Sequence, residues 1–482
     1  KRKGVITMKH NYTADFINEP EIHSILEQTA NMPKSELQQI INKAREAKGL
    51  NIREVAALIQ LEDEELLQEM FKVALEIKQK IYGKRLVLFA PLYLSSYCVN
   101  NCVYCGYRCA NKTERKKLTM DEIREEVEAM EELGHKRIML DMGEDPVNAP
   151  IEYVVEAMKT IYDTMKDNGA IRRINVQIAA TTVEDYKKLK EAGIGTYILF
   201  QETFHRETYA KMHPSGPKRD YDWHTTAMDR AMEAGIDDVG MGVLFGLYDY
   251  RFEVVALMFA IRHLEEKFGV GPHTISFPRM RAAEGVNLDT FPYLVDDRQF
   301  KKIVAVLRLA VPYTGLILST REKPNYRDEV IDLGISQMSA GSCVGIGGYK
   351  KELENLRRGV ENYEDLSSAQ FEVSDHRSPD QILRRICEAG YIPSYCTACY
   401  RKGRTGDRFM ALAKTGQIQN VCQPNAILTF KEYLMDYASP ETREIGEKTI
   451  QEHLEYITDP KIKQMTIEEL KKIENGTRDL YF

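Results

Sequence analysis

Three cysteines lie close together at Cys98, Cys102 and Cys105, and an aromatic residue, Tyr104, stands just before the last of them. Thiolates with the spacing CX3CX2C can converge from one short loop onto one face of a metal cluster. A 4Fe-4S cluster normally takes four cysteine thiolates, so three would leave one iron open. An open iron on a redox-active cluster can bind a small chelating molecule, and the spacing predicts this chemistry.

Other metal chemistry fits the same loop. A structural zinc site needs a fourth Cys or His nearby, and Cys109 extends the run to CX3CX2CX3C. A disulfide pair, or a cluster held by Cys102, Cys105 and Cys109, is also compatible with the spacing. The position of Tyr104 favours Cys98, Cys102 and Cys105 as the three ligands.

A second group of three cysteines follows much later in the chain, at Cys396, Cys399 and Cys422, with the spacing CX2CX22C. No obvious fourth ligand accompanies these three thiols. We predict a second 4Fe-4S cluster with an open site, and structural zinc with a distant ligand is the alternative. The nine cysteines are odd in number and spaced for metal rather than for disulfides, which indicates a reducing compartment.

The segments that must position these cysteines alternate, from Arg85 onward, between short apolar runs and amphipathic helical patterns. Eight apolar runs predict strands, each followed by a helix or a long loop, and this alternation predicts a complete (β/α)8 barrel. An open, doubly wound parallel sheet is the alternative, because the number of strands alone does not prove closure. The runs begin at Leu86, Arg137, Ile174, Thr196, Asp238, His273, Gly315 and Ile335.

Polar residues follow the ends of the predicted strands. Active sites of such barrels lie at the C-terminal ends of the strands, so these residues are expected to meet the first cysteine group at one mouth. They are Gly143-Glu144-Asp145, Gln201-Glu202, Arg279, Arg281, Arg321-Glu322 and Gly341-Ser342.

The chain divides into three predicted parts. Residues 1–84 form an N-terminal helical extension, because apolar residues recur there at spacings of three and four. Residues 85–375 form the barrel. Residues 376–482 form a C-terminal helical domain that carries the second cysteine group.

The composition is ordinary for a soluble globular protein, with 482 residues, 43% hydrophobic and 29% charged. A formal net charge of −7 argues against a nucleic-acid partner, which usually requires a basic face. No run of 18 apolar residues is present, and residues 1–16 lack the apolar stretch of a signal peptide. We therefore expect a cytoplasmic protein with no membrane partner.

With both cysteine groups, the barrel and the strand-end residues considered together, the sequence resembles the tyrosine-lyase branch of the radical S-adenosylmethionine (SAM) enzymes. Within that branch it is similar to the maturases of FeFe hydrogenase. The resemblance covers nearly the whole chain, and the CX2CX22C group after a complete barrel is its most specific feature. The related 2-iminoacetate synthase of thiamine biosynthesis shares the barrel and the tyrosine cleavage, but not the second cluster.

The resemblance implies roles for residues at the first mouth. The superfamily has a Gly-Gly-Glu motif that contacts the SAM amino group, and here Met142 replaces its first glycine. The matching positions are Cys98, Cys102 and Cys105 as cluster ligands, and Tyr104, Gly143, Glu144 and Glu202 as SAM contacts.

The resemblance also implies a substrate site and a second metal site. Ser319 and Arg321 match the tyrosine-binding strand, where a guanidinium can take the substrate carboxylate through two parallel hydrogen bonds. His273 matches a histidine that holds an extra, labile iron, and it lies at the N-terminal end of its strand, opposite the SAM mouth. The ligands of the second cluster would be Cys396, Cys399 and Cys422.

The implied cofactors are two 4Fe-4S clusters, SAM and the labile iron. The implied reaction abstracts hydrogen from L-tyrosine and gives p-cresol and dehydroglycine, which is converted to carbon monoxide and cyanide on iron for assembly of the FeFe-hydrogenase active site. The expected partners are L-tyrosine, a reductant such as ferredoxin or flavodoxin, and a hydrogenase-assembly scaffold protein. The alternatives are a thiamine-pathway 2-iminoacetate synthase and a non-catalytic iron-sulfur scaffold.

Overall fold

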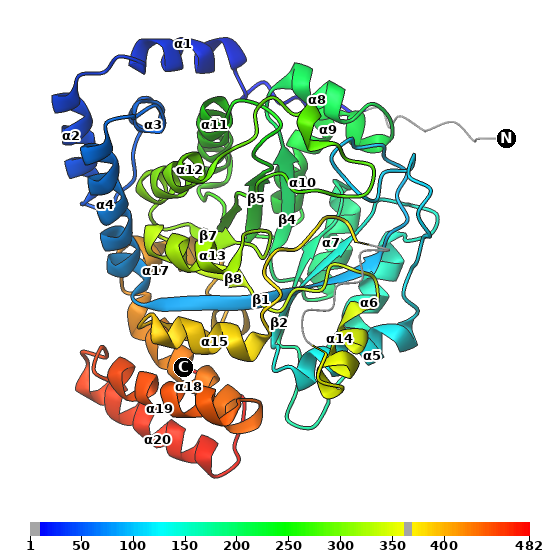
Figure 1. Ribbon diagram of the computed structural model, residues 1–482, viewed down its shortest axis with the longest axis vertical. Helices are drawn as coiled ribbons and strands as arrows, with labels where there is room; N and C mark the ends of the chain where they lie inside the picture. Colours follow the sequence, from blue (N-terminus) through cyan, green and yellow to red (C-terminus); the bar gives the residue numbers. More distant parts are fainter. Residues whose placement is uncertain (1–9, 361–368) are drawn as a thin grey trace.

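The structure, a computed structural model, describes residues 10–360 and 369–482. Residues 1–9 of the predicted N-terminal extension and residues 361–368 of the predicted barrel lie outside the described residues. Eight parallel strands form the centre of the fold (Figure 1). They are β1 (Arg85–Ser95), β2 (Arg137–Met142), β3 (Arg173–Gln177), β4 (Tyr197–Glu202), β5 (Val239–Val243), β6 (Thr274–Ser276), β7 (Gly315–Leu318) and β8 (Gln337–Ser339).

The eight strands close on themselves. The sheet runs in the order β2 to β8 and then β1, and β1 also pairs with β2. Every pairing between named strands is parallel. The predicted complete (β/α)8 barrel is therefore confirmed, and the open doubly wound sheet is wrong.

Helices cover the outside of the barrel, as parallel strands require. Several begin where a side chain caps the free N–H groups of the first turn, such as the capping boxes at Thr119 and Asp296. These helices are α5 (Met120–Glu132), α6 (Ile151–Asp163), α7 (Val183–Glu191), α8 (Arg206–Met212), α9 (Tyr221–Thr225), α10 (Ala227–Glu233), α11 (Tyr250–Phe268), α12 (Asp297–Ala310), α13 (Pro324–Val330) and α14 (Gly348–Arg357).

Helical segments precede and follow the barrel in the sequence. α1 (Glu19–Thr29), α2 (Lys34–Ala44), α3 (Ile52–Ile59) and α4 (Glu64–Tyr82) run along one flank, against α11 and α12 (Figure 1). The C-terminal segment contains α15 (Pro379–Glu388), α16 (Ala398–Arg401), α17 (Gly406–Lys414), α18 (Gln419–Asp436), α19 (Pro440–Leu454) and α20 (Pro460–Glu474). The boundaries of the three predicted parts stay a prediction. None of the described helices has the length and apolar character needed to cross a lipid bilayer.

β1 is the strand to which both cysteine groups are attached. All eleven of its residues are buried. Its C-terminal half pairs with β2, and its first residues, Arg85–Val87, pair with a short ninth strand, β9 (Ile392–Ser394), that the sequence analysis did not predict. At about 3.3 Å per residue, β1 is about 35 Å long. Cys98 follows the C-terminal end of β1. Cys396 follows β9, which lies beside the N-terminal end of β1.

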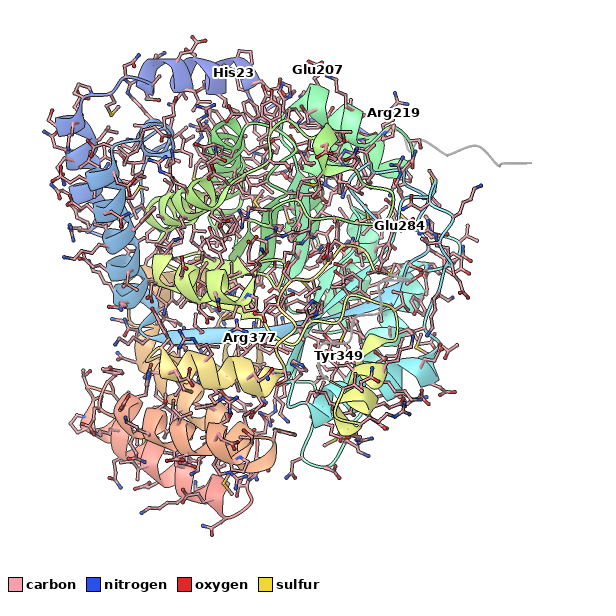
Figure 2. The ribbon with its side chains drawn as sticks, in the orientation of Figure 1. His23, Glu207, Arg219, Glu284, Tyr349 and Arg377 are labelled. Atoms are coloured by element: carbon pink, nitrogen blue, oxygen red, sulfur yellow. The ribbon has the colours of Figure 1, made fainter. Side chains whose placement is uncertain are left out.

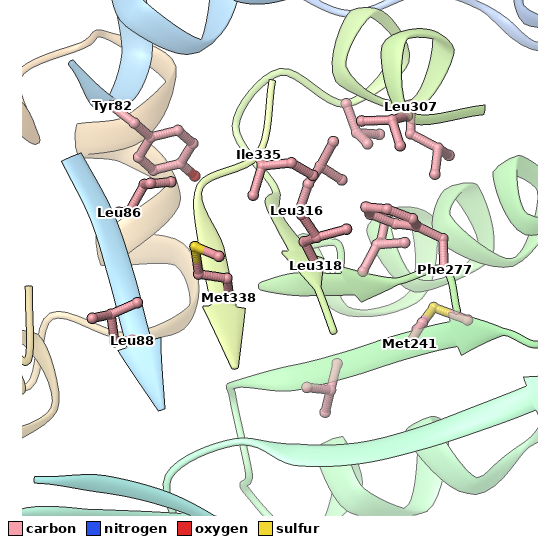
Figure 3. Packing of buried hydrophobic residues seen from close by; sticks show 14 of the residues in the cluster. Tyr82, Leu86, Leu88, Met241, Phe277, Leu307, Leu316, Leu318, Ile335 and Met338 are labelled. Carbon is pink, nitrogen blue, oxygen red and sulfur yellow. The ribbon is translucent and has the colours of Figure 1, made fainter. Parts of the chain in front are cut away.

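The apolar core is continuous between the barrel and its covering helices. Figure 3 shows Leu316 and Leu318 of β7 between Leu307 of α12 and Met338 of β8. Because both faces of a parallel sheet are covered, its strands are rich in buried aliphatic residues. This core fixes the strand ends that carry the polar residues.

We expect Leu316→Ala to lower the free energy of unfolding by about 2 to 5 kcal/mol, because it removes a fully buried side chain and leaves a cavity. Denaturant unfolding measures the loss. Met165→Ala is the control, since Met165 is 69% exposed and should change the value by about 0.5 kcal/mol at most. Equal effects of the two substitutions would contradict the assignment of Leu316 to the core.

Candidate functional site

The first cysteine loop lies at the C-terminal end of β1. Cys98, Cys102 and Cys105 lie close enough that their charges affect one another, whereas Cys109 is exposed. Burial raises the pKa of all three clustered thiols, that of Cys105 to about 12. A coordinating thiol is deprotonated by the metal charge, so these clustered thiols, of which Cys102 is buried and the other two are partly buried, suit a metal cluster.

The segment Gly143-Glu144 is packed directly against this loop. A Cβ atom on Gly143 would lie 2.3 Å from the carbonyl oxygen of Tyr97 and 2.9 Å from Cβ of Cys98, so only glycine fits. The Val99 N–H donates to the carbonyl oxygen of Glu144 at 2.8 Å. The structure therefore brings together the predicted cluster ligands and the predicted SAM-binding motif.

Asn100, inside the cysteine loop, connects two further segments to it. Its side-chain amide donates to Oε2 of Glu144 at 2.6 Å, and its Oδ1 accepts from the N–H of Lys218 at 2.9 Å. Glu144 is partly buried, and burial raises its pKa. A cleft of about 310 Å³ opens beside Glu144, between the ends of β2 and β3.

Tyr104 is held by a histidine that the sequence analysis missed. The His213 ring is buried, and its Nδ1 lies 2.8 Å from the carbonyl oxygen of Tyr209, to which it must donate. Nε2 is then the acceptor, and the Tyr104 hydroxyl donates to it at 2.8 Å. Burial lowers the pKa of His213 to about 3, which keeps the ring neutral. The hydroxyl of Tyr104 is thus satisfied by a hydrogen bond within the protein, and its aromatic ring is left to pack against other groups.

Glu202 reaches the mouth through an irregular backbone. The register of β4 with β5 shifts between Phe200 and Glu202, and Glu202 has φ of 69°, in the left-handed region that is unusual for glutamate. Its Oε1 pairs with Nζ of Lys218 at 2.8 Å. Burial opposes the charge of Lys218, but Glu202 and Cys102 outweigh it and hold the pKa of Lys218 above its usual value.

Arg321 lies in the same mouth. Burial lowers its pKa, and its nearest charged or ionisable neighbours include Tyr93, Glu202 and Asp141. Its guanidinium stacks on the ring of Phe371, 3.5 Å from the ring centroid. Among the described residues, no carboxylate forms an ion pair with Arg321. The guanidinium is therefore free to bind an anionic ligand.

Residues 369–375 form a strap across the mouth. The Gly106 N–H donates to the carbonyl oxygen of Gln370 at 3.0 Å, and the Ser374 N–H to that of Thr320 at 3.0 Å. A Cβ atom on Gly106 would lie 2.7 Å from the carbonyl oxygen of Ala369, so the strap can approach the cysteine loop only because this residue is glycine. The strap covers Arg321 and carries Phe371.

The strap is fixed at its C-terminal end by a buried ion pair. Asp375 is fully buried against Arg327 of α13, and Arg377 (Figure 2) also binds Asp375, at 2.7 Å. Arg327 also donates to the carbonyl oxygen of Ser339, in β8, at 2.5 Å. These contacts hold the strap against the ends of the last strands.

The remaining residues at the strand ends have different roles. Some form structural ion pairs, and one, Asp141, was not predicted from the sequence. Arg279 and Arg281 both bind Glu322, so they link the ends of β6 and β7 rather than face a ligand. Asp141 of β2 is buried beside Arg321, and burial raises its pKa to about 7, although Arg321 and Lys218 oppose this shift. The N–H of Arg321 donates to Oγ of Ser319 at 3.3 Å, which places Ser319 at the same mouth.

The second cysteine group lies at the opposite end of the barrel. Cys396, Cys399, Cys422 and His273 line one pocket of about 60 Å³, together with residues at the N-terminal ends of five other strands. The structure therefore brings His273 together with the three cysteines, although it lies more than 120 residues from them in the sequence. Across residues 10–360 and 369–482, no three His, Cys, Asp or Glu side chains come together as ligands of a single metal ion.

Cations surround this second group. A hydrogen bond with Cys399 lowers the pKa of Cys422 to about 6; burial opposes the shift, and Arg85, Arg404 and Arg137 support it. Nη1 of Arg137 donates to the carbonyl oxygen of Cys396 at 3.1 Å. Thiolates are the form that binds iron, and nearby guanidinium groups favour them.

His273 has the properties of a metal ligand. Burial lowers its pKa, so the ring is neutral at pH 7, which is the form that coordinates metal. Its Nδ1 is buried without a hydrogen bond among the described residues. The three thiols and this ring fit an iron-sulfur cluster with a further iron beside it, which is the site that the sequence resemblance implies.

Comparison with known proteins gives a consistent result. Residues 92–259 match the radical SAM superfamily, and residues 276–392 match the biotin and thiamin synthesis associated domain. The 2-iminoacetate synthase of Escherichia coli (strain K12) is 30% identical over 354 residues, which cover 73% of this chain and 89% of that protein. Two crystal structures of HydG, described as a maturase of FeFe hydrogenase, are similar over nearly the whole chain.

One of these HydG structures is 62% identical, with a TM-score of 0.93, and covers 97% of this chain and 100% of that one. The other, from Carboxydothermus hydrogenoformans, is 39% identical, with a TM-score of 0.81 and coverage of 96% and 100%. The closed barrel and its cysteine loop are those of a radical SAM protein. Within that superfamily, the chain belongs to the HydG family. The resemblance seen in the sequence is confirmed.

We expect Lys218→Met to destabilise the protein, because it leaves the Glu202 carboxylate buried without its partner. Breaking a buried ion pair on one side costs about 3 to 5 kcal/mol. Urea unfolding of the cluster-free protein measures the loss, and adding Glu202→Gln should recover part of it. Lys211→Met, which breaks the exposed pair with Glu207 on α8, is the control and should change nothing measurable. An equal change in the free energy of unfolding in the Lys218→Met and Lys211→Met variants would contradict the stabilising role of the Lys218–Glu202 ion pair.

Proposed function

We propose that this protein cleaves L-tyrosine to p-cresol and dehydroglycine, and converts dehydroglycine to carbon monoxide and cyanide for assembly of the FeFe-hydrogenase active site. The observation that supports this proposal best is that the two groups of three cysteines lie at opposite ends of one barrel. Arg321 lies in the mouth beside the first group. The HydG family carries the maturase role by name. Two sites at opposite ends of the barrel suit two successive steps, which are radical cleavage of tyrosine at the mouth and conversion of dehydroglycine on iron at the floor.

At the first mouth, Cys98, Cys102 and Cys105 would hold a 4Fe-4S cluster. Bound there with SAM, the cluster supplies a 5′-deoxyadenosyl radical. Gly143 and Glu144 would contact the SAM amino group, because the packing of Gly143 against the loop carries this segment to the open iron. Glu202 and the ring of Tyr104 would complete the SAM site.

Arg321 would bind the tyrosine carboxylate. Its planar fork can form two parallel hydrogen bonds with a carboxylate, and its own carboxylate partners are absent among the described residues. Ser319 lies beside it. The strap, residues 369–375, would keep water from the reacting groups, since a radical and a reactive imine are both quenched by solvent. Phe371 adds an aromatic surface beside the guanidinium.

At the barrel floor, Cys396, Cys399 and Cys422 would hold the second 4Fe-4S cluster, and His273 would bind the labile iron. Guanidinium groups around the thiols favour their anionic form. A reductant such as ferredoxin or flavodoxin, and a hydrogenase-assembly scaffold protein that receives the product, are the proposed partners. A cytoplasmic location would suit both.

A 2-iminoacetate synthase is the second candidate, favoured by the 30% identity over most of the Escherichia coli enzyme. It would need the first cluster only. Iron per chain after anaerobic reconstitution separates the two: about eight or nine indicates two clusters, and about four indicates one. A non-catalytic scaffold would give no deoxyadenosine or p-cresol with SAM, dithionite and tyrosine.

The two cysteine groups should be separable by substitution. We expect Cys105→Ala, like Cys98→Ala or Cys102→Ala, to abolish SAM cleavage, because two thiolates cannot hold a cluster with one defined open iron. Cys109→Ala is the matched control on the same loop and should retain it. Loss of cleavage in Cys109→Ala but not in Cys98→Ala would show that the ligands are Cys102, Cys105 and Cys109.

Substitution at the floor should have a narrower effect. We expect Cys396→Ala or Cys422→Ala to retain p-cresol formation and to lose most of the carbon monoxide and cyanide bound to iron. Chromatography of p-cresol and infrared spectroscopy of iron-bound products measure the two steps. An equal loss of p-cresol would show that the two sites act as one.

Arg321→Lys should weaken tyrosine binding by about 1 to 3 kcal/mol, because lysine keeps the charge but loses the planar fork. The tyrosine dependence of p-cresol formation measures the loss. The change that SAM causes in the cluster spectrum should persist. Arg124→Lys, on the exposed face of α5, is the control. An unchanged tyrosine dependence would remove Arg321 from the substrate site, and a lost SAM signal would assign it to SAM instead.

A further inference from the structure

A buried carboxylate lies beside His273 at the barrel floor. Asp238, just before β5, is 1% exposed, and neither of its oxygens has a hydrogen bond among the described residues. It lines the same pocket as His273 and the three cysteines of the second group. A buried carboxylate without hydrogen bonds costs several kcal/mol as a charge, so it is not retained for stability.

The groups around Asp238 do not satisfy it. The Thr196 hydroxyl lies nearby but pairs with the Tyr400 hydroxyl at 3.2 Å. Arg173 faces Asp238 electrostatically, but it stacks on Tyr400 at 3.7 Å, and its Nε makes no hydrogen bond. The neighbouring Asp237 is exposed and binds Thr405 instead, at 3.0 Å. Among the described residues, one basic side chain lies within 4 Å of the Asp238 carboxylate.

That neighbour is the His273 ring. Nδ1 of His273 lies 3.8 Å from Oδ1 of Asp238, and both atoms are buried without a hydrogen bond. Phe409 packs edge-on against the ring, 4.4 Å between centroids, which limits its rotation. A shift of less than 1 Å would bring Nδ1–H within hydrogen-bond distance of the carboxylate. Nε2 is then the only ring atom left to bind a metal.

We infer that Asp238 is a positioning residue, which accepts a hydrogen bond from Nδ1–H of His273 and thereby directs Nε2 toward iron at the C-terminal cysteine site. The inference rests on the proposed function, because it concerns the labile iron. Metal-binding histidines commonly donate their other ring N–H to a carboxylate, which fixes the tautomer and makes the metal-binding nitrogen more basic. The carboxylate also adds negative charge beside a cation, which offsets its burial.

Four variants of the full chain, reconstituted anaerobically with iron and sulfide, test the inference. Asp238→Ala removes the acceptor, Asp238→Leu fills the space with an apolar side chain that has no acceptor, and Asp238→Asn keeps an acceptor and the volume without the charge. Asp237→Asn is the matched control on the adjacent, exposed residue. The measurements are the affinity for added Fe²⁺ beyond the two clusters, determined against a chelator, and the hyperfine coupling of ¹⁵N-labelled histidine to iron.

We expect Asp238→Ala and Asp238→Leu to bind the extra iron about 10- to 100-fold more weakly, which is the usual effect of removing such a carboxylate. Asp238→Asn should fall between them and the wild type, and Asp237→Asn should match the wild type. The histidine coupling should weaken in the same order. A role in packing alone would leave both the leucine and the asparagine variants close to the wild type, whereas positioning requires leucine to bind the extra iron more weakly than asparagine, so this order separates the two roles even where the alanine variant does not fold.

Two outcomes would overturn the inference, and they differ in what they imply. If Asp238→Leu binds the extra iron as tightly as the wild type, Asp238 does not position His273, although the proposed function stands. If the wild type and Asp237→Asn hold no iron beyond the two clusters, the proposed labile-iron site is itself wrong, and the inference fails with it.

Discussion

The parallel pairing of β1 is the constraint on which the two candidate sites depend. The C-terminal half of this strand pairs with β2, and its N-terminal part pairs with β8 in the closed barrel and with β9. Because every β1 residue is buried, neither end can shift without breaking packed contacts. The first cysteine loop and the second cysteine group are thus held at a fixed separation, on the order of 30 Å along the strand.

The two ends are built with different electrostatics. At the mouth, Lys218 pairs with Glu202, and the three thiols keep a raised pKa. At the floor, the pKa of Cys422 is lowered, first by its hydrogen bond with Cys399 and then by Arg85, Arg404 and Arg137, whereas the pKa values of Cys396 and Cys399 are raised. One thiol of the floor therefore favours the anionic form before any metal binds, whereas the other five thiols depend on a metal to deprotonate them.

Most of the barrel could be predicted from the sequence, because apolar runs and helical periodicity are local signals. All eight runs begin within two residues of the observed strands. β9 was missed because it has three residues, one of them Pro393, and gains its order only by pairing with β1. Lys218, His213 and Asp141 were missed as well, since their roles depend on burial and on neighbours distant in the sequence, not on spacing. His273 was placed at the floor only through resemblance, although its strand position was consistent with it.

The mouth and the floor also differ in how they exclude water. The strap closes the mouth with backbone hydrogen bonds and with Phe371 against Arg321, and glycine at position 106 is what permits its close approach. The floor is closed by side chains of the C-terminal segment, including Phe409 against His273. A backbone strap can open as a unit, whereas a floor of packed rings opens only with its helices. Local opening is therefore better suited to the mouth than to the floor.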